Sequence, residues 1–395
     1  MKIIYLHQYF LTPEQGGAIR SYHLAKALVE AGHDVEMITS HNNSHYHYEN
    51  IEGIKVHYLP VYYENNLSSF GRIISFLKFI YRAYEKATEI DDVDYCYTTS
   101  TPLTIGLVAI WLRRLHRINY DFEVRDLWPE APIQMGVIKN YFVKKYLFFL
   151  EKRIYSKAER IIALSPGIEE GIRKKVPGKE IHLIPNFSDC DFFHPEEKDP
   201  KLEEHFAVKG KFVISYFGAL GKANHLDYLI DAAIELSRKD DERVHFLIAG
   251  KGAELSFIKE KVRKNGLKNI HFVGFINKDS LHNMLNITDA VYISFAKKPI
   301  LETTSPNKFF DGLAAGKLCI SNTKGWMKDL IEQNHCGFYY DPEQPADFAE
   351  KILPYTKDHS LLKKAQTNAR QLAEREFSKE LMVEKFLLLM NEAQP

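Results

Sequence analysis

The feature that most constrains the fold of this chain is an alternation of short apolar runs with helical patterns, which restarts near residue 211. The first series of predicted strands is KIIYLH (2–7), HDVEMITS (33–40), YCYTTS (95–100), INYDFEV (118–124) and RIIALS (160–165). The second series is KFVISYFGAL (211–220), VHFLIAG (244–250), IHFVGF (270–275) and AVYISF (290–295). Strands that alternate with helices predict two parallel sheets, each covered by helices on both faces.

The chain has 395 residues, which favours more than one domain. Residues 186–210 separate the two series and are polar, charged and turn-rich, as is typical of a linker. We predict an N-terminal domain over residues 1–195 and a C-terminal domain over residues 196–374. Residues 375–395 are predicted to hold an amphipathic helix that packs back toward the N-terminal domain.

Composition excludes several classes of protein. Lys plus Arg and Asp plus Glu both number 52, so nothing favours a nucleic acid partner. The four cysteines are far apart, which argues against a zinc ribbon or a disulfide scaffold and favours a cytoplasmic setting. The first apolar run is broken by His7 and Gln8 and is interpreted as a strand instead of a signal peptide. No apolar stretch is long enough to span a bilayer.

The segment ETTSPNKFFDGLAAGK (302–317) predicts a short helix with an anion site at its start. Ser305 is the expected N-cap, Pro306 suits the first turn and Gly316 suits the C-terminal stop. Lys308 lies in the first turn, where a lysine opposes the helix dipole unless an anion such as a diphosphate binds there.

Asp311 follows Lys308 at a spacing that places both on one helix face, where a carboxylate could accept hydrogen bonds from ribose hydroxyls. The alternative is an exposed ion pair between Lys308 and Asp311. Gly16 and Gly17 lie between the first strand and the first helix, where glycine lets the backbone approach a phosphate closely. A tight turn without a ligand is the alternative for these glycines.

Several motifs in order resemble the family 4 retaining glycosyltransferases of the GT-B fold. They are GGAIRSYHLAKALVEAGHDVEMIT (16–39), ALSPGIEEGI (163–172), IPNFSDCDFF (184–193) and SPNKFFDGLAAGK (305–317). The segment RDLWPE (125–130) is similar to one in bacterial enzymes that assemble surface polysaccharides such as O-antigen and capsule. The resemblance implies an α/β protein with two Rossmann-like domains facing across a cleft. The N-terminal domain would bind the acceptor and the C-terminal domain the nucleotide sugar.

The resemblance also implies a set of donor-binding residues. Lys222 and Lys308 would bind the diphosphate, and Gly17 would present its amide to it. Asp311 matches the second acid of the family's E-x7-E pattern, whereas Thr303 stands at the first acidic position and Glu302 one position early. The full expected donor set is Gly16, Gly17, Lys222, Glu302, Thr303, Ser305, Asn307, Lys308 and Asp311.

On the acceptor side, Arg125 and Asp126 align with the family's His-Asp region near the anomeric carbon. Asp126 is the expected group that orients or deprotonates the acceptor hydroxyl, and Glu130 is a second candidate. A structural ion pair between Arg125 and Asp126 is the alternative. The resemblance implies front-face attack assisted by the departing phosphate oxygen, whose charge Lys222, Lys308 and helix N-termini would stabilise.

Metal and dinucleotide cofactors are not expected. Asp189 and Asp191 form a D-x-D tripeptide like that of the GT-A fold, but their linker context matches GT-B members, and a metal needs more converging ligands. His41, His45 and His47 have the composition of a solvated loop. Residues 249–254 (AGKGAE) carry only part of a dinucleotide fingerprint.

Two segments interleave basic and aromatic residues. Residues 139–160 hold seven basic and two acidic residues, and residues 70–87 hold four and one. Helices of this kind can lie on an anionic membrane surface, and the alternative is that both pack on the N-terminal sheet. A polyprenyl-linked acceptor would make peripheral contact natural, at the inner face of the cell membrane.

The sequence thus predicts a retaining glycosyltransferase of the hexosyl or N-acetylhexosaminyl type. It would transfer a sugar from a nucleoside diphosphate, with UDP favoured, to a glycan or a polyprenyl-diphosphate-linked acceptor in polysaccharide biosynthesis. One alternative is a nucleotide-sugar epimerase of the same fold. The other is a non-catalytic partner that binds nucleotide sugar, because Thr303 replaces an acid.

Overall fold

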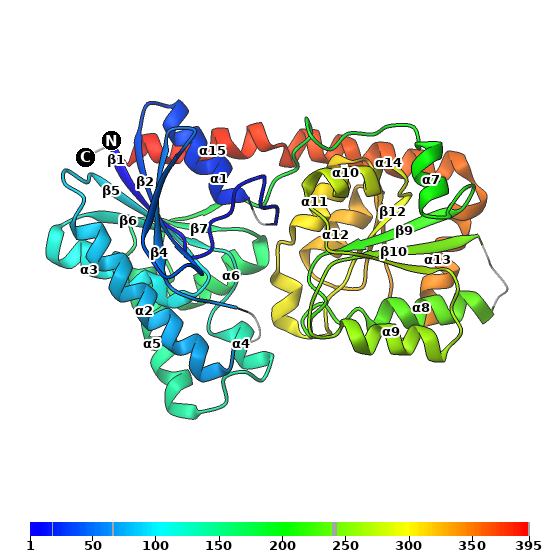
Figure 1. The fold of residues 1–395 in the computed structure, drawn as a ribbon, viewed down its shortest axis with the longest axis horizontal. Coiled ribbons are helices and arrows are strands. Elements are labelled where there is room, and N and C mark those ends of the chain that lie inside the picture. The colour runs from blue at the N-terminus through cyan, green and yellow to red at the C-terminus, as the bar shows by residue number, and fades with distance from the viewer. Residues whose placement is uncertain (18, 65–66, 239–242, 394–395) are drawn as a thin grey trace. The chain divides into compact units, whose positions relative to one another are not determined.

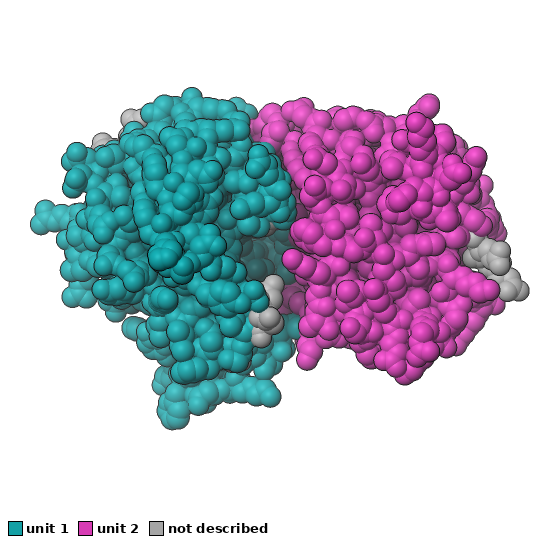
Figure 2. Space-filling model, viewed as in Figure 1, with its two compact units in different colours: residues 1–185, 303–305, 382–395 teal, residues 186–302, 306–381 magenta. Residues whose placement is uncertain are grey.

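The computed structural model describes residues 1–17, 19–64, 67–238 and 243–393 (Figure 1). These residues form two compact units, which Figure 2 distinguishes by colour. The first unit comprises Met1–Pro185, Thr303–Ser305 and Met382–Pro395, and the second comprises Asn186–Glu302 and Pro306–Leu381. The restart of the sequence pattern therefore corresponds to a second unit with its own sheet.

The first unit is built on an eight-stranded sheet of order β3-β4-β2-β1-β5-β6-β7-β8. Its neighbouring strands pair in parallel except β3, which is antiparallel to β4. The strands are β1 (Lys2–Leu6), β2 (Asp34–His41), β3 (His47–Ile51), β4 (Ile54–Pro60), β5 (Tyr95–Thr99), β6 (Asn119–Val124), β7 (Ile161–Ala163) and β8 (Ile181–Leu183). Its helices include α1 (Arg20–Glu30), α2 (Ser69–Thr88), α3 (Gly106–Trp111), α4 (Glu130–Gln134), α5 (Tyr141–Lys157) and α6 (Pro166–Lys175).

The second unit is built on a six-stranded parallel sheet of order β11-β10-β9-β12-β13-β14. The strands are β9 (Phe212–Phe217), β10 (Val244–Ala249), β11 (Ile270–Gly274), β12 (Ala290–Ile293), β13 (Leu318–Ser321) and β14 (Gly337–Tyr339). The helices are α7 (Pro200–His205), α8 (Asp227–Arg238), α9 (Leu255–Lys264), α10 (Lys278–Asn286), α11 (Asn307–Ala314), α12 (Trp326–Gln333), α13 (Pro345–Lys357) and α14 (His359–Leu372). In Figure 1, α8 and α9 lie on one side of this sheet and α10 and α11 on the other.

Both sheets have the strand order of a doubly wound fold. In the second unit the chain adds β10 and β11 on one side of β9, then returns to add β12, β13 and β14 on the other. Side chains of the central strands, such as Ile214, Tyr216, Phe246 and Tyr292, are buried in the core. The predicted α/β class, with parallel sheets covered by helices, is confirmed.

The division between the units differs from the predicted boundary at residue 195, because residues 186–195 pack on the second unit. Ser188 Oγ donates to the carbonyl oxygen of Phe310 at 2.8 Å, and Lys278 Nζ contacts Asp189 Oδ2 at 2.6 Å. A polar composition suits a linker, but here the polar groups have partners on one unit.

The C-terminal helix α15 (Lys379–Glu392) contributes its residues from Met382 onward to the first unit. The ring of Phe386 lies 5.1 Å from that of Tyr97, and Arg160 donates to the carbonyl oxygen of Leu389. These contacts bind the end of the chain to the first unit.

One local expectation, that His41, His45 and His47 belong to a solvated loop, needs correction. His41 ends β2 and His47 begins β3, so they belong to strands, and only the residues between them form a connection. His41 Nε2 donates to the carbonyl oxygen of His45 at 2.8 Å, which satisfies one ring nitrogen within this connection. The four cysteines are buried and carry free thiols.

We predict that Gly337→Ala destabilises the second unit. Gly337 lies opposite Cys319 in the β13–β14 pair, and an added Cβ would lie 1.8 Å from the Cys319 carbonyl oxygen. Overpacking of this kind should lower the free energy of unfolding by about 2–3 kcal/mol. Gly221→Ala is the matched control, since the position of its Cβ is open space. Urea unfolding measures both variants, and an unchanged midpoint for Gly337→Ala would contradict the close packing.

Candidate functional site

The centre of the second unit has the geometry of a ligand site. Strand order reverses between β9 and β12, and in such sheets ligands bind at the carboxyl ends of the strands beside the reversal. Gly218 follows β9 with φ +137°, and Gly250 follows β10 with φ +147°. A Cβ on Gly250 would lie 1.9 Å from the Gly218 carbonyl oxygen, so glycine permits these two loops to meet backbone to backbone.

Lys308 lies against the loop that follows β9. It is buried in the first turn of α11, with Nζ 4.0 Å from the centre of the Tyr216 ring and 3.4 Å from Asn224 Oδ1. A Cβ on Gly218 would lie 3.2 Å from Lys308 Nζ, so this loop and the amine are neighbours. Burial lowers the pKa of Lys308 to about 7. A negative charge on a bound ligand would favour the protonated, positively charged form of the Lys308 amine.

Asp311 lies one turn further along α11. Burial raises the pKa of its carboxyl group to about 7, although the positive charge of Lys278 acts in the opposite direction. No ion pair joins Lys308 to Asp311, two residues that the structure describes, so the alternative of an exposed pair is wrong. A buried amine and a half-buried carboxyl group, both with strongly shifted pKa values and beside a strand-order reversal, are typical of a functional site.

The start of α11 differs from the expected capping. The helix begins at Asn307, and Pro306 occupies the N-cap position without a side-chain hydrogen bond to cap it. Ser305 is therefore one residue too early to be the N-cap. The predicted stop at Gly316 is confirmed, because Gly316 follows the C-cap Ala315 with φ +60°.

The remaining donor candidates lie around these residues or in the first unit. Lys222 is exposed in the connection between β9 and α8, and Asn307 is the first residue of α11. Glu302 is half-buried within a 3₁₀ helix over Pro299–Thr303, whereas Thr303 and Ser305 group with the first unit.

In the first unit, Gly16 and Gly17 connect β1 to α1 in the left-handed conformation, with φ +70° and +86°. A Cβ on Gly17 would also lie 3.2 Å from Leu11 Cδ1. Both positions thus require glycine for the shape of the turn. This explains the tight turn, while the role of Gly17 toward a phosphate stays a prediction.

The turn leads into a buried ion pair between Arg20 and Glu123, which the sequence does not predict. Arg20 is buried at the start of α1, and its Nε lies 2.9 Å from Glu123 Oε2. The other guanidinium nitrogens donate to the carbonyl oxygens of Pro185 and Ile184 at 2.6 and 2.9 Å. Arg20 lies within the glycine-containing segment 16–39, but its partner lies 103 residues away in the sequence, so the pair has no local sequence signal.

The acceptor candidates lie at the carboxyl edge of the first sheet. Arg125 follows β6, its backbone N–H donates to Ser100 Oγ at 3.0 Å, and its Nη1 donates to His7 Nε2 at 3.3 Å. Burial and the nearby Arg125 charge hold the pKa of His7 well below its usual range, so the ring is a neutral acceptor. In the sequence, His7 is notable only as a residue that interrupts an apolar run, so its contact with Arg125 is not predicted.

Asp126 is next to Arg125 on the same edge. Burial raises the pKa of Asp126 to about 6, and the charge of Arg125 partly opposes this shift. The guanidinium of Arg125 turns to His7, and no ion pair with Asp126 is found between these described residues. A carboxyl group with a raised pKa, available at the end of a strand, has the properties of a general acid or base.

Glu130 has structural partners. It forms an ion pair with Lys175, which also contacts Glu151 Oε1 at 2.5 Å. Burial raises the pKa of Glu151 to about 7. Because this cluster joins α4, α5 and α6, its contacts favour a role for Glu130 in holding these helices.

The D-x-D tripeptide does not present two converging carboxylates. Asp189 Oδ1 lies 2.9 Å from Lys379 Nζ and Asp189 Oδ2 lies 2.6 Å from Lys278 Nζ, while the Asp191 side chain is largely exposed. Although burial opposes it, hydrogen bonds from Lys278 and Lys379 hold the pKa of Asp189 below its usual value. Asp189 thus anchors its segment to the second unit.

Comparison with known proteins assigns the two halves of the chain to related families. The model described as a glycosyl transferase 4-like domain matches residues 15–186, and the model described as glycosyl transferases group 1 matches residues 197–372. The uncharacterized glycosyltransferase MJ1069 of Methanocaldococcus jannaschii is 22% identical over 61% of this chain and 61% of its own. The alpha-galactosylglucosyldiacylglycerol synthase of Streptococcus pneumoniae is 22% identical over 65% of this chain and 66% of its own. The chain thus spans about three fifths to two thirds of the length of these relatives.

Solved structures show the same fold over nearly the whole chain. Sucrose-phosphate synthase from Thermosynechococcus elongatus matches with a TM-score of 0.80 at 17% identity, covering 99% of this chain and 98% of its own. Anabaena Alr3699/HepE, solved in complex with UDP and glucose, matches with a TM-score of 0.72 at 18% identity, covering 99% of each chain. These matches show the GT-B fold, and the two family models, which together match residues 15–186 and 197–372, show that the protein belongs to the family 4 glycosyltransferases.

Proposed function

We propose that this protein is a retaining transferase that moves a hexosyl or N-acetylhexosaminyl group from a UDP-sugar to a glycan or polyprenyl-diphosphate-linked acceptor in bacterial polysaccharide biosynthesis. The observation that carries the donor half is the buried Lys308 amine beside the Gly218 loop, with Asp311 one turn away. The choice of UDP rests on the structural match to a protein solved with UDP and glucose.

In this proposal, Lys308 binds the diphosphate and Asp311 accepts hydrogen bonds from ribose. Lys222 is exposed on the loop after β9 and supplies a second positive charge. The bond between the anomeric carbon and the phosphate oxygen breaks, and the acceptor oxygen bonds to the same face of the sugar. The acceptor proton passes to the departing phosphate oxygen, whose charge Lys308 stabilises. These cations replace the metal that other transferases use, so the reaction has no obligatory metal or cofactor.

On the acceptor side, Asp126 orients the attacking hydroxyl. Its carboxyl group is ionised at pH 7, because its pKa is raised only to about 6. Arg125 keeps positive charge beside it without a direct pair, and Arg125 is itself oriented by His7 and Ser100. A carboxylate so placed accepts the hydrogen bond of a hydroxyl and aligns its oxygen for attack.

A polyprenyl-linked acceptor requires the enzyme to work at a membrane, and α2 and α5 have surfaces that suit this. Both helices pack against α3, with Phe79 and Ile154 among their buried side chains. The packed-helix alternative therefore accounts for one face of each helix. The opposite faces expose large apolar side chains, with Phe70 73% and Phe142 78% exposed.

We call the exposed apolar side chains of α2 and α5, together with the lysines and arginines beside them, the basic-aromatic surface. Its apolar members are Phe70, Ile73, Ile74, Leu77, Tyr81, Tyr141, Phe142, Val143, Tyr146, Phe148 and Phe149. Its exposed basic members are Lys78, Arg82, Lys145, Lys152 and Arg153. Apolar insertion together with basic charge is the chemistry that recognises an anionic lipid surface. The basic-aromatic surface supports the proposal that the enzyme works at the inner face of the cell membrane.

Peripheral contact is the form of association that we propose. In the described part of the chain, no helix combines the length and hydrophobicity needed to cross a bilayer. The proposed lipid contact is made by the side chains of the basic-aromatic surface.

We predict that Lys308→Met weakens UDP binding about 10- to 100-fold, because it removes a charge-assisted hydrogen bond to phosphate. Calorimetry with UDP in EDTA measures the affinity. At pH 8 the wild-type complex should take up a proton, since the Lys308 amine with a pKa of about 7 becomes charged beside the diphosphate. Lys317→Met is the matched control, because Lys317 is also buried, with a pKa lowered to about 8 by burial. Equal UDP affinity in wild type and Lys308→Met would contradict the assignment.

Asp311→Asn tests the ribose contact in the same titration. We predict about tenfold weaker binding of UDP, because an amide is a weaker acceptor than a carboxylate. Binding of inorganic diphosphate should not change, since it has no ribose. Preference for GDP over UDP in the wild type would overturn the choice of base.

We predict that Asp126→Asn lowers transfer by about 10²- to 10³-fold while UDP affinity stays at the wild-type value. Transfer is measured as UDP release from UDP-glucose or UDP-N-acetylglucosamine with a polyprenyl-diphosphate-linked sugar as acceptor, and the product anomer reports retention. Asp94→Asn is the control, because Asp94 bonds Lys2 N at the opposite, amino edge of the same sheet. Full turnover by Asp126→Asn would remove this residue from catalysis.

We predict that the wild-type protein sediments with vesicles containing phosphatidylglycerol and much less with pure phosphatidylcholine. A Phe142→Ser/Phe149→Ser variant should lose at least about fivefold in the bound fraction, since each buried aromatic ring contributes about 1.5–3 kcal/mol. Phe257→Ser is the control: Phe257 is 56% exposed but lies on α9 of the second unit. Unchanged sedimentation of the α5 variant would exclude the basic-aromatic surface as the contact.

A further inference from the structure

The second unit begins with residues 186–196, and this segment packs along one face of α10. Lys278 Nζ contacts Asp189 and lies 4.0 Å from the centre of the Phe192 ring. Asn286 Nδ2 donates to Glu196 Oε2 at 3.1 Å. Lys278, His282 and Asn286 are spaced four residues apart, so they share one face of the helix. The face that His282 occupies is thus turned to this segment.

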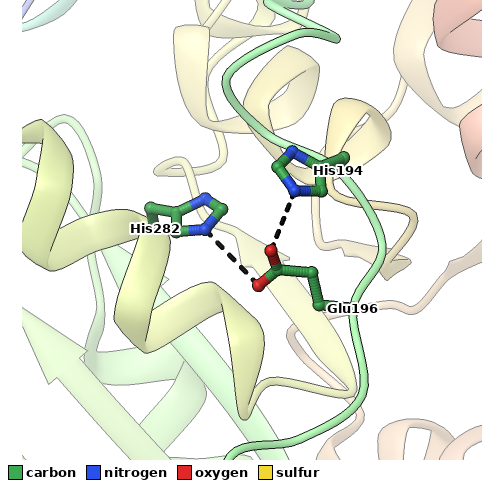
Figure 3. A group of neighbouring side chains, drawn as sticks. All are labelled: His194, Glu196 and His282. Carbon is green, nitrogen blue, oxygen red and sulfur yellow. Dashed lines mark ion pairs between the residues drawn. The ribbon is translucent and has the colours of Figure 1, made fainter.

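His282 meets two ligand-type side chains of the segment (Figure 3). His194 Nε2 lies 2.8 Å from Glu196 Oε1, and His282 Nε2 lies 3.5 Å from Glu196 Oε2. One ligand atom from each of the three residues lies within 4.8 Å of the other two. In Figure 3, both imidazole rings direct a nitrogen toward the carboxylate, which lies between them.

We propose that His194, Glu196 and His282 bind a zinc ion. Two imidazole nitrogens and one carboxylate oxygen form a ligand set that Zn²⁺ prefers, with water as the fourth ligand. Ligand atoms at about 2.1 Å from a tetrahedral ion lie about 3.4 Å apart. The pairs in the cluster are 2.8 and 3.5 Å apart, so small side-chain movements admit the ion. Mg²⁺ and Ca²⁺ do not fit, because they prefer oxygen ligands.

The surroundings hold the ligands in position. Asn286 orients the Glu196 carboxylate, and the His282 ring packs against Phe192 and Phe193, with ring centres 5.6 and 6.3 Å away. Supporting contacts of this kind fix ligand rings and tune affinity. His194 and Glu196 are exposed and His282 is half-buried, so an ion can enter from solvent.

The ion would join two parts of the second unit that lie about 90 residues apart in the chain. Because zinc would bind the folded site and has no comparable site in the unfolded chain, it would stabilise the second unit by mass action. Its role is structural and separate from the proposed transfer, which uses Lys308 and Asp311. The proposal therefore does not depend on the proposed function.

Zinc binding to the full-length protein is measured by competition with a chromophoric chelator, and Co²⁺ absorption reports the ligand geometry. We expect one ion per chain, with a dissociation constant of about 1–10 μM or lower. Binding should be at least about tenfold weaker in His194→Ala, Glu196→Gln and His282→Ala. Zinc should raise the Tm of the wild-type protein by about 3 °C. His271→Ala is the matched control, since His271 Nε2 lies 3.3 Å from His245 Nδ1 in the same unit.

His194 is exposed, so His194→Ala keeps the test valid even where His282→Ala unfolds. A wild-type dissociation constant above about 100 μM overturns the proposal. So does zinc binding that His194→Ala leaves unchanged, or that His271→Ala abolishes. Donor binding in EDTA is measured separately, so failure of the zinc site and failure of the donor site are distinguishable.

Discussion

The reversal of strand order at the centre of each sheet is the constraint on which the rest of this structure depends. Parallel strands need helical crossovers, and a sheet that grows outward from its middle sends the crossovers before and after the reversal to opposite faces. Loops that leave the two central strands therefore diverge, and the backbone between them is left without a covering element. In the second unit, Gly218 and Lys308 lie at this point.

Burial of charge at that point costs stability in a way that a structural role does not explain. Burial lowers the pKa of Lys308 from 10.5 to about 7, so the free energy of unfolding decreases as the pH falls through this window. Desolvation raises the pKa of Asp311 from 3.8 to about 7, so the free energy of unfolding decreases as the pH rises through this second window. Near pH 7 both penalties are almost complete. A diphosphate and a ribose would offset them, which is why the pair favours a ligand site over a packing role.

Local chemistry made much of this fold predictable. Periodicity located β1, β2, β5, β6 and β7 of the first sheet and β9 to β12 of the second, but it did not locate β3, β4, β8, β13 or β14. The glycine at position 316 located the end of α11, because each of these signals depends on residues close in sequence. The misplaced N-cap had a different cause. Ser305 and Pro306 both suit the first positions of a helix, and propensity does not decide between registers one residue apart.

Features that depend on distant partners were not predictable. The partner of Arg20 is Glu123, the partner of Glu130 is Lys175, and His7 meets Arg125 from the other end of the first unit's sequence. Residues 186–195 do have the composition of a linker, but Asp189 forms ion pairs with Lys278 and Lys379, which are distant in the sequence. A single sequence shows which residues carry charge, whereas the fold decides which charges meet.

The two units divide the chemistry between them. The proposed donor-binding groups lie in the second unit, where Lys308 is buried next to the Gly218 loop and Asp311 is half-buried. In the first unit, Asp126, whose pKa is raised to about 6, lies at the carboxyl edge of the sheet, and α2 and α5 expose apolar side chains. A soluble donor needs a pocket that replaces its hydration shell, whereas a lipid-linked acceptor stays anchored in the bilayer and needs a protein surface that comes to it. Under the proposed function, the different solvation of the two substrates would be a physical reason for the contrast between the buried Lys308 in one unit and the exposed apolar side chains of the other.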